Sequence, residues 1–134
     1  MGQDNSKPQI EATRASISFR EKNLTSFPCI IPENHPIESI DLASNRSKEL
    51  PTNLPHLHFL DYSDNDLKNI SKDIELAILS FPSLSEFHLS SNNLEKIPES
   101  FEMLSSLHLL FLDHNKISKF SLRISSLHNL DLSC

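Results

Sequence analysis

The sequence predicts an α/β fold built as a curved solenoid. Short parallel strands would form the concave face, with loops and short helices on the convex face. A pattern of apolar residues recurs along the chain, starting at Ile37, Leu57, Leu84, Leu107 and Leu127. Its period of about 20 to 27 residues is in the range of solenoid repeats. The spacing inside each copy fits neither a helix, with its period of about 3.6 residues, nor a long alternating strand.

Each copy follows the order L-x-x-L-x-L-x-x-N-x-L-x-x-L with small departures. The copies are ISFREKNLTSFP from Ile17, IESIDLASNRSKELP from Ile37, LHFLDYSDNDLKNI from Leu57, LSEFHLSSNNLEKIP from Leu84, LHLLFLDHNKISKF from Leu107 and LHNLDLSC from Leu127. The first copy is degenerate and the last is incomplete. This order resembles the leucine-rich repeat family over roughly residues 15–134. The resemblance implies a fold and says little about function.

Each part of the copy has a physical role. The L-x-L part predicts a short strand with two side chains facing inward, and the asparagine turns the chain. Its amide both donates and accepts hydrogen bonds, so it can satisfy backbone groups of the turn and of the next coil. The predicted ladder consists of Asn45, Asn65, Asn92 and Asn115. Lys22 holds this position in the first copy and has no side-chain acceptor, which predicts a degenerate terminal cap.

Two inward positions and two connecting segments depart from the simple pattern. Ser47 and Tyr62 replace leucines, so each should weaken the core unless its hydroxyl finds a partner. SKDIELAILSFP (71–82) predicts a helix with Ser71 as its N-cap. ESFEMLSSL (99–107) predicts a short helical turn around Phe101.

The domain organisation follows from the same pattern. Residues 1–13 (MGQDNSKPQIEAT) are polar and predict a flexible tail with a candidate myristoylation site. Residues 14–134 predict one solenoid of about five to six repeats, with the last one incomplete. The pattern stops at Cys134, one residue short of the ladder position. We expect an open edge strand there, covered by a partner or by further chain.

Composition excludes many function classes. The chain has 134 residues, 37% of them hydrophobic, and a formal net charge of −6. A single glycine, Gly2, leaves no phosphate-cradling loop, dinucleotide fingerprint or nucleophile elbow, and no HExxH or CxxC motif occurs. DYSDNDLK (61–68) begins a run that lacks the glycine and glutamate of a calcium loop. We therefore expect no enzyme, no cofactor and no metal ion.

The ends of the chain indicate a compartment. No apolar run reaches the ~18 residues of a membrane span, and no signal peptide opens the chain. Cys29 and Cys134 do not form the clustered-cysteine cap of extracellular leucine-rich repeat proteins, which indicates the cytoplasm. MGQDNSK matches the myristoylation pattern at Gly2, with Ser6 in place. One such acyl chain binds membranes weakly, so we expect a reversible membrane-associated pool.

The predicted concave face is acidic and carries aromatic residues. Lysines and arginines lie instead after the asparagine turns, as at Lys68 and Lys96. Such a face suits a protein partner with a basic segment and repels nucleic acid. The partner-binding residues that we predict are Glu38, Asp41, Phe59, Asp61, Glu86, His88, Leu109, Phe111, Asp113 and Asp131.

Histidines on this face suggest an alternative, a zinc site. His58, His108 and His128 share one predicted column, with backbones of adjacent strands about 5 Å apart. Three ligands in one strand column rarely give tetrahedral geometry. Histidines that contact solvent or a partner are therefore the favoured interpretation.

Two function classes remain. The first is an intracellular protein–protein interaction module, acting in signalling through its concave face. The second is the N-terminal targeting or regulatory part of a longer signalling enzyme. It rests on a resemblance to intracellular amoeboid leucine-rich repeat proteins, some of which continue into a type 2C protein phosphatase or a kinase. None of the phosphatase's metal-binding aspartates maps onto this chain. A bacterial-type effector with a ligase domain is a third option, suggested only by LPTNLPHL (50–57).

Overall fold

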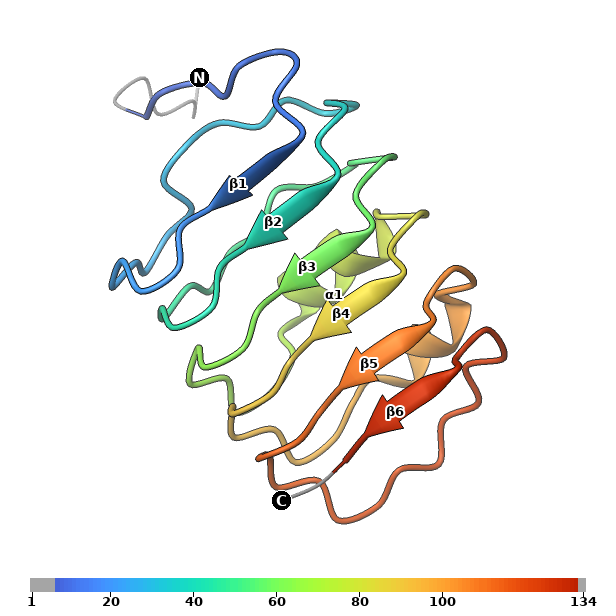
Figure 1. The fold of residues 1–134 in the computed structure, drawn as a ribbon. Coiled ribbons are helices and arrows are strands. Elements are labelled where there is room, and N and C mark those ends of the chain that lie inside the picture. The colour runs from blue at the N-terminus through green and yellow to red at the C-terminus, as the bar shows by residue number, and fades with distance from the viewer. Residues whose placement is uncertain (1–6, 133–134) are drawn as a thin grey trace.

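One parallel sheet organises the protein. The computed structural model describes residues 7–132 and has an α/β fold with a six-stranded parallel sheet. The strands lie side by side in sequence order (Figure 1), as β1 (Ser16–Ser18), β2 (Ser39–Asp41), β3 (Phe59–Asp61), β4 (Glu86–His88), β5 (Leu109–Phe111) and β6 (Asn129–Asp131). We call each strand, with the chain that follows it up to the next strand, a coil. This topology is compatible with a solenoid-like repeat.

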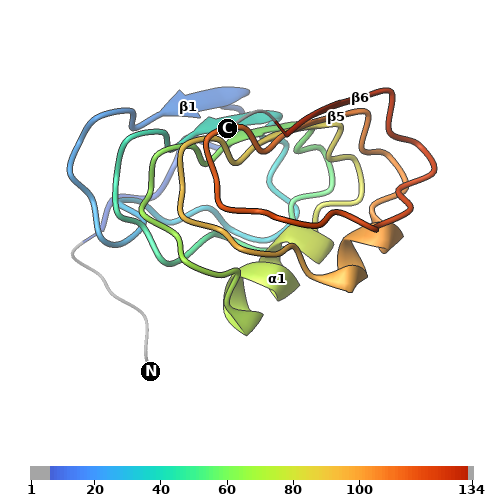
Figure 2. The same ribbon diagram turned by 90° about the horizontal axis from the view of Figure 1, so that it is seen from below.

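The helices lie on the side away from the sheet. Helix α1 (Lys72–Leu79) follows β3, and the 3-10 helix η1 (Glu99–Met103) follows β4. Figure 2 shows the strands along one side of the stacked coils and both helices on the opposite side. Ser71 is the N-cap of α1, as the sequence predicts, and its Oγ accepts a hydrogen bond from the Ile74 N–H at 3.3 Å. Phe101 in η1 is fully buried.

The core lies between the sheet and the returning chain. Because the strands are parallel and in register, their middle residues form one column that includes Ile40, Leu60, Phe87 and Leu110. All four are completely buried. The alternation of a strand sends the residue on each side of this column outward. The L-x-L pattern therefore separates core from surface.

The asparagine ladder (Asn45, Asn65, Asn92 and Asn115) joins successive coils. Asn92 Oδ1 accepts hydrogen bonds from the N–H groups of Asn65 at 2.8 Å and Leu67 at 3.0 Å, in the preceding coil. Its Nδ2 donates to the Leu89 carbonyl of its own turn at 3.0 Å. Asn45, Asn65 and Asn115 bond the coil before them in the same way.

The sequence predicts that each asparagine bonds backbone groups of the next coil. In the structure each asparagine instead accepts hydrogen bonds from the preceding coil. Backbone N–H groups after each strand point forward along the stack. The Tyr62 N–H, for example, donates to the His88 carbonyl at 2.8 Å. Donors that point forward need an acceptor on the following coil, and the next asparagine side chain provides it.

The residue before each ladder position has a left-handed backbone. These residues are Glu21, Ser44, Asp64, Ser91 and His114, with φ between 54° and 60°. Such a conformation costs a non-glycine residue roughly 1 kcal/mol or more. The Ser91 N–H donates forward to the Asp113 carbonyl at 2.9 Å. Hydrogen bonds of this kind offset the strain, so the turns form without glycine.

Ser47 and Tyr62 are the polar residues at inward positions, and the hydroxyl group of each donates a hydrogen bond inside the core. The Tyr62 hydroxyl donates to the Ser47 carbonyl, and the Ser47 hydroxyl donates to the Glu49 carbonyl at 3.0 Å. Both residues are fully buried. Burial raises the pKa of the Tyr62 phenol well above its ordinary value. Neither residue leaves an unpartnered hydroxyl.

The predicted flexible tail, residues 1–13, differs from the structure in its second half. The Ile10 N–H donates to the Ile30 carbonyl at 2.9 Å, and the Ile30 N–H donates to the Pro8 carbonyl at 2.8 Å. Ile10 also packs against the core. An apolar residue in a polar stretch thus attaches this segment to the first coil. Residues 1–6 lie outside the described part.

Replacing Asn92 with alanine should lower the free energy of unfolding by about 1–3 kcal/mol, because buried N–H groups of Asn65 and Leu67 lose their acceptor. The matched control is Asn93→Ala, since Asn93 makes an exposed side-chain bond to Asp66 and should cost about 0.5 kcal/mol. Thermal and urea unfolding measure both variants. Equal shifts for the two would contradict the ladder.

Alkaline pH should unfold the protein through Tyr62. The folded state holds the phenol proton more tightly than the unfolded state, so this contribution to stability is present below the unfolded pKa of about 10 and is lost as pH rises above it. Tyr62 is the only tyrosine and no tryptophan occurs. The absorbance band of tyrosinate therefore reports Tyr62 alone, and it should appear together with unfolding followed by circular dichroism. Tyr62→Phe should weaken the alkaline transition. Reversible ionisation near pH 10 in a folded chain would contradict the burial.

Candidate functional site

The outward side chains of the sheet form a continuous surface, which we call the strand face. The third positions of neighbouring strands lie in register, so Asp41, Asp61, His88, Phe111 and Asp131 form one row across β2 to β6. The first positions form a second row: Ser39, Phe59, Glu86, Leu109 and Asn129. Glu38 directly precedes β2, and Asp113 lies two residues beyond β5. The predicted partner-binding residues therefore lie on or beside one sheet.

Three rings meet on β3, β4 and β5, and we call them the aromatic cluster (Phe59, His88 and Phe111). The His88 ring stacks on Phe111 with centroids 4.4 Å apart and planes inclined by 17°. Phe59 lies on the other neighbouring strand, 5.3 Å from His88 between centroids. His88 Nε2 lies 2.7 Å from Glu86 Oε2, which orients the imidazole. All three rings are half-buried.

A second group, the arginine cluster (Arg20, Asp41 and Asp61), occupies the other half of the strand face. Arg20 Nε donates to Asp41 Oδ2 and its second nitrogen to Asp61 Oδ2, both at 2.9 Å. The guanidinium thereby ties the first coil to the third. The hydrogen bond to Asp41, with the charges of both carboxylates, raises the pKa of Arg20. Asp61 is only 7% exposed.

These two clusters change the predicted acidic face in specific ways. The sequence predicts that Asp41 and Asp61 bind a partner, but the guanidinium of Arg20 binds both and compensates one of their two negative charges. Phe59 and Phe111, which the sequence predicts as partner-binding residues, are half-buried, and His88 packs between them. Sequence reasoning missed the role of Arg20 on this face. The available signal was strand alternation, which places Arg20 two residues beyond β1 on the face of the aspartates.

Two further carboxylates of the face, Glu38 and Asp113, contact histidines. Glu38 Oε1 lies 3.6 Å from His58 Nε2, and Asp113 Oδ2 lies 3.8 Å from His114 Nε2. Asp113 also accepts a hydrogen bond from the Ser90 hydroxyl. The surface around β4 and β5 can thus offer stacking, hydrogen bonding and negative charge.

The histidine column does not form a zinc site within residues 7–132. His108 and His128 are neighbours, with ring centroids 4.8 Å apart in an edge-to-face arrangement. Among the described residues, no three or more histidine, cysteine, aspartate or glutamate side chains are grouped so as to hold a metal ion. The pair is exposed to solvent.

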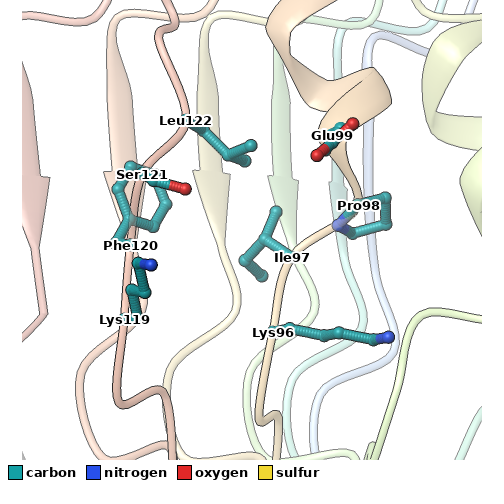
Figure 3. A pocket seen from close by; sticks show the side chains of 8 residues that line it. All are labelled: Lys96, Ile97, Pro98, Glu99, Lys119, Phe120, Ser121 and Leu122. Carbon is teal, nitrogen blue, oxygen red and sulfur yellow. The ribbon is translucent and has the colours of Figure 1, made fainter.

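A cleft of about 350 Å³ lies between the fourth and fifth coils, beyond their asparagine turns (Figure 3). Ile97 and Leu122 project into it from the two backbones, while Lys96 and Lys119 lie at one end and Glu99 at the other. The full lining is Lys96, Ile97, Pro98, Glu99, Lys119, Phe120, Ser121 and Leu122. This set combines apolar side chains with two amines, one carboxylate and one hydroxyl, and it contains no imidazole or thiol.

No protein-family model matches the chain, and no curated protein matches it. Among the described residues, none of the helices has the length and apolar character needed to cross a membrane. Gly2, the predicted lipidation site, lies outside residues 7–132, and its acylation stays a prediction.

The arginine cluster should be an energetic unit. Arg20→Met keeps the unbranched apolar stem of the side chain but leaves Asp41 and Asp61 without their cation. Because Arg20 is half exposed, the free energy of unfolding should fall by only roughly 1 kcal/mol. A double-mutant cycle with Asp61→Asn should give a coupling of similar size, measured by urea unfolding at low salt. Additive effects would show that the contact contributes nothing.

Proposed function

We propose that this chain is a leucine-rich repeat protein of the cytoplasm that binds a protein partner on its strand face. In this proposal the sheet is the concave side of a curved solenoid and the helices lie on the convex side. The six parallel strands in sequence order and the asparagine ladder support the repeat interpretation. The chain would act as an interaction module in signalling, without catalysis of its own.

The observation that carries the proposal is the aromatic cluster. Phe59 and Phe111 lie half-buried on a sheet surface, ordered by His88 and flanked by carboxylates. Aromatic side chains that lie partly exposed next to each other lose further apolar area when a partner covers them. They resemble in chemistry the anchors that dominate binding energies at protein interfaces.

The arginine cluster favours partner binding on one part of the strand face only. Asp41 and Asp61 already share one guanidinium, so one of their two negative charges is compensated within the chain. Glu86 and Asp113 form their described ion-pair contacts with histidines. The proposed partner therefore engages β4 and β5 more than β2 and β3, and it carries basic residues. An acidic surface of this kind disfavours nucleic acid.

Phe111→Ala combined with Asp113→Lys should reduce partner capture about tenfold or more, because losing an interface anchor costs about 2 kcal/mol. Affinity capture from cell extract, quantified by mass spectrometry against wild type, measures the loss. Circular dichroism should show that the variant remains folded.

The control is charge reversal at Lys68 and Lys96, two exposed lysines beyond the asparagine turns. These changes alter the net charge in the opposite direction and should leave capture intact. If the lysine changes abolish capture and the strand-face changes do not, the partner binds elsewhere and the proposed face is wrong.

A further inference from the structure

We infer that the partner segment is an extended peptide with the pattern basic–x–apolar–x–basic, laid along β4 and β5. This inference rests on the proposed function and specifies the chemistry of its ligand. It follows from the spacing of three features on the strand face: the Glu86 carboxylate, the aromatic cluster and the Asp113 carboxylate.

The spacing along the strands comes from the register. Glu86 occupies the first position of β4, and its partner in β5 is Leu109. His88 and Phe111 occupy the third positions and pair with each other. Asp113 lies two residues further along the fifth coil. At about 3.3 Å per residue, the row of Glu86 and the row of Asp113 lie about 13 Å apart, with the stacked rings midway.

An extended peptide has the same repeat. Its side chains at positions i, i+2 and i+4 project from one face, and i and i+4 are also about 13 Å apart. A peptide that lies along the strands can therefore place one side chain at Glu86, one over the rings and one at Asp113. The pattern is symmetric, so it fits either chain direction.

Charge defines which residues fit the two outer positions of the peptide. The side-chain contacts of Glu86 and Asp113 within residues 7–132 go to His88, His114 and the Ser90 hydroxyl. Neither carboxylate forms an ion pair with a lysine or arginine of the described chain. Both side chains are accessible, at 33% and 21%. A lysine or arginine of the partner would supply the missing cation at each end.

The arginine cluster shows that the surface accommodates this chemistry. Arg20 lies two residues beyond β1, at the position that Asp113 holds beyond β5. Its guanidinium reaches carboxylates on β2 and β3 while remaining half exposed. A guanidinium can therefore bind carboxylates on this sheet, and on β2 and β3 the chain's own arginine already does so.

The aromatic cluster defines the middle position. Phe111 is covered on one side by His88, and Leu109 lies two residues before it in the same strand. Phe111 and Leu109 are both half-buried, so apolar surface remains open beside the rings. An aliphatic or aromatic side chain would bury that surface. The neighbouring basic groups could in addition stack on the Phe59 or Phe111 faces.

A displayed library of random nonapeptides tests the inference. Selection is made on the full chain and, in parallel, on Phe111→Ser, with folding checked by circular dichroism. We expect peptides enriched on wild type alone to carry two basic residues four positions apart with an apolar residue midway. Selected peptides should bind the variant at least tenfold more weakly. Synthetic peptides with the apolar residue moved by one position, at equal composition, should also lose at least tenfold in affinity.

Charge swaps make the test independent of Phe111. Asp113→Lys or Glu86→Lys should change the preference at one end of the peptide from basic to acidic. Glu95→Lys, an exposed change of equal charge beyond the asparagine turn, should leave the preference unchanged. Two outcomes would overturn the inference and leave the proposed function standing. In the first, enriched peptides need Phe111 but lack the spacing. In the second, they keep both basic residues after the swap. If no peptide distinguishes wild type from Phe111→Ser and Asp113→Lys, both the inference and the proposed function are overturned.

Discussion

The structure depends on one constraint: backbone N–H groups that point forward along the stack must each meet an acceptor. Within the strands, the next strand's carbonyls accept them. In the turns no strand is available, and the amide oxygen of the next asparagine takes that role, as Asn92 does for Asn65 and Leu67. The asparagine Nδ2 then closes its own turn. Stacking, register and turn geometry all follow from this arrangement.

The register imposed by the ladder also creates the strand face. The third residues of the strands are in register and form one row. Each of these side chains therefore lies next to the corresponding side chain of the neighbouring coil. Asp41 and Asp61 come into reach of one guanidinium, and His88 meets Phe111. The contacts of Arg20 stabilise the early coils against each other. The stacking of His88 on Phe111 leaves ordered rings on a surface, where they are available to a ligand.

Charge is distributed unevenly as a result. The chain has a formal net charge of −6, and on β2 and β3 Arg20 compensates one of the two carboxylate charges. Around β4 and β5 the carboxylates contact histidines instead. The same face thus combines a closed half, which contributes to folding, with a half whose charge and apolar area remain accessible.

The sequence by itself determined the strands, the inward column, the ladder positions and the two helical segments, because each depends on local periodicity and on residue chemistry within one coil. It also predicted that Tyr62 would need a hydroxyl partner. Only the tertiary structure decided the rest. The direction of the ladder, the capture of Asp61 by Arg20 and the stacking of His88 on Phe111 depend on contacts between residues 23 to 41 positions apart. Such contacts depend on the register between coils, and local pattern does not specify which long side chain reaches which neighbour.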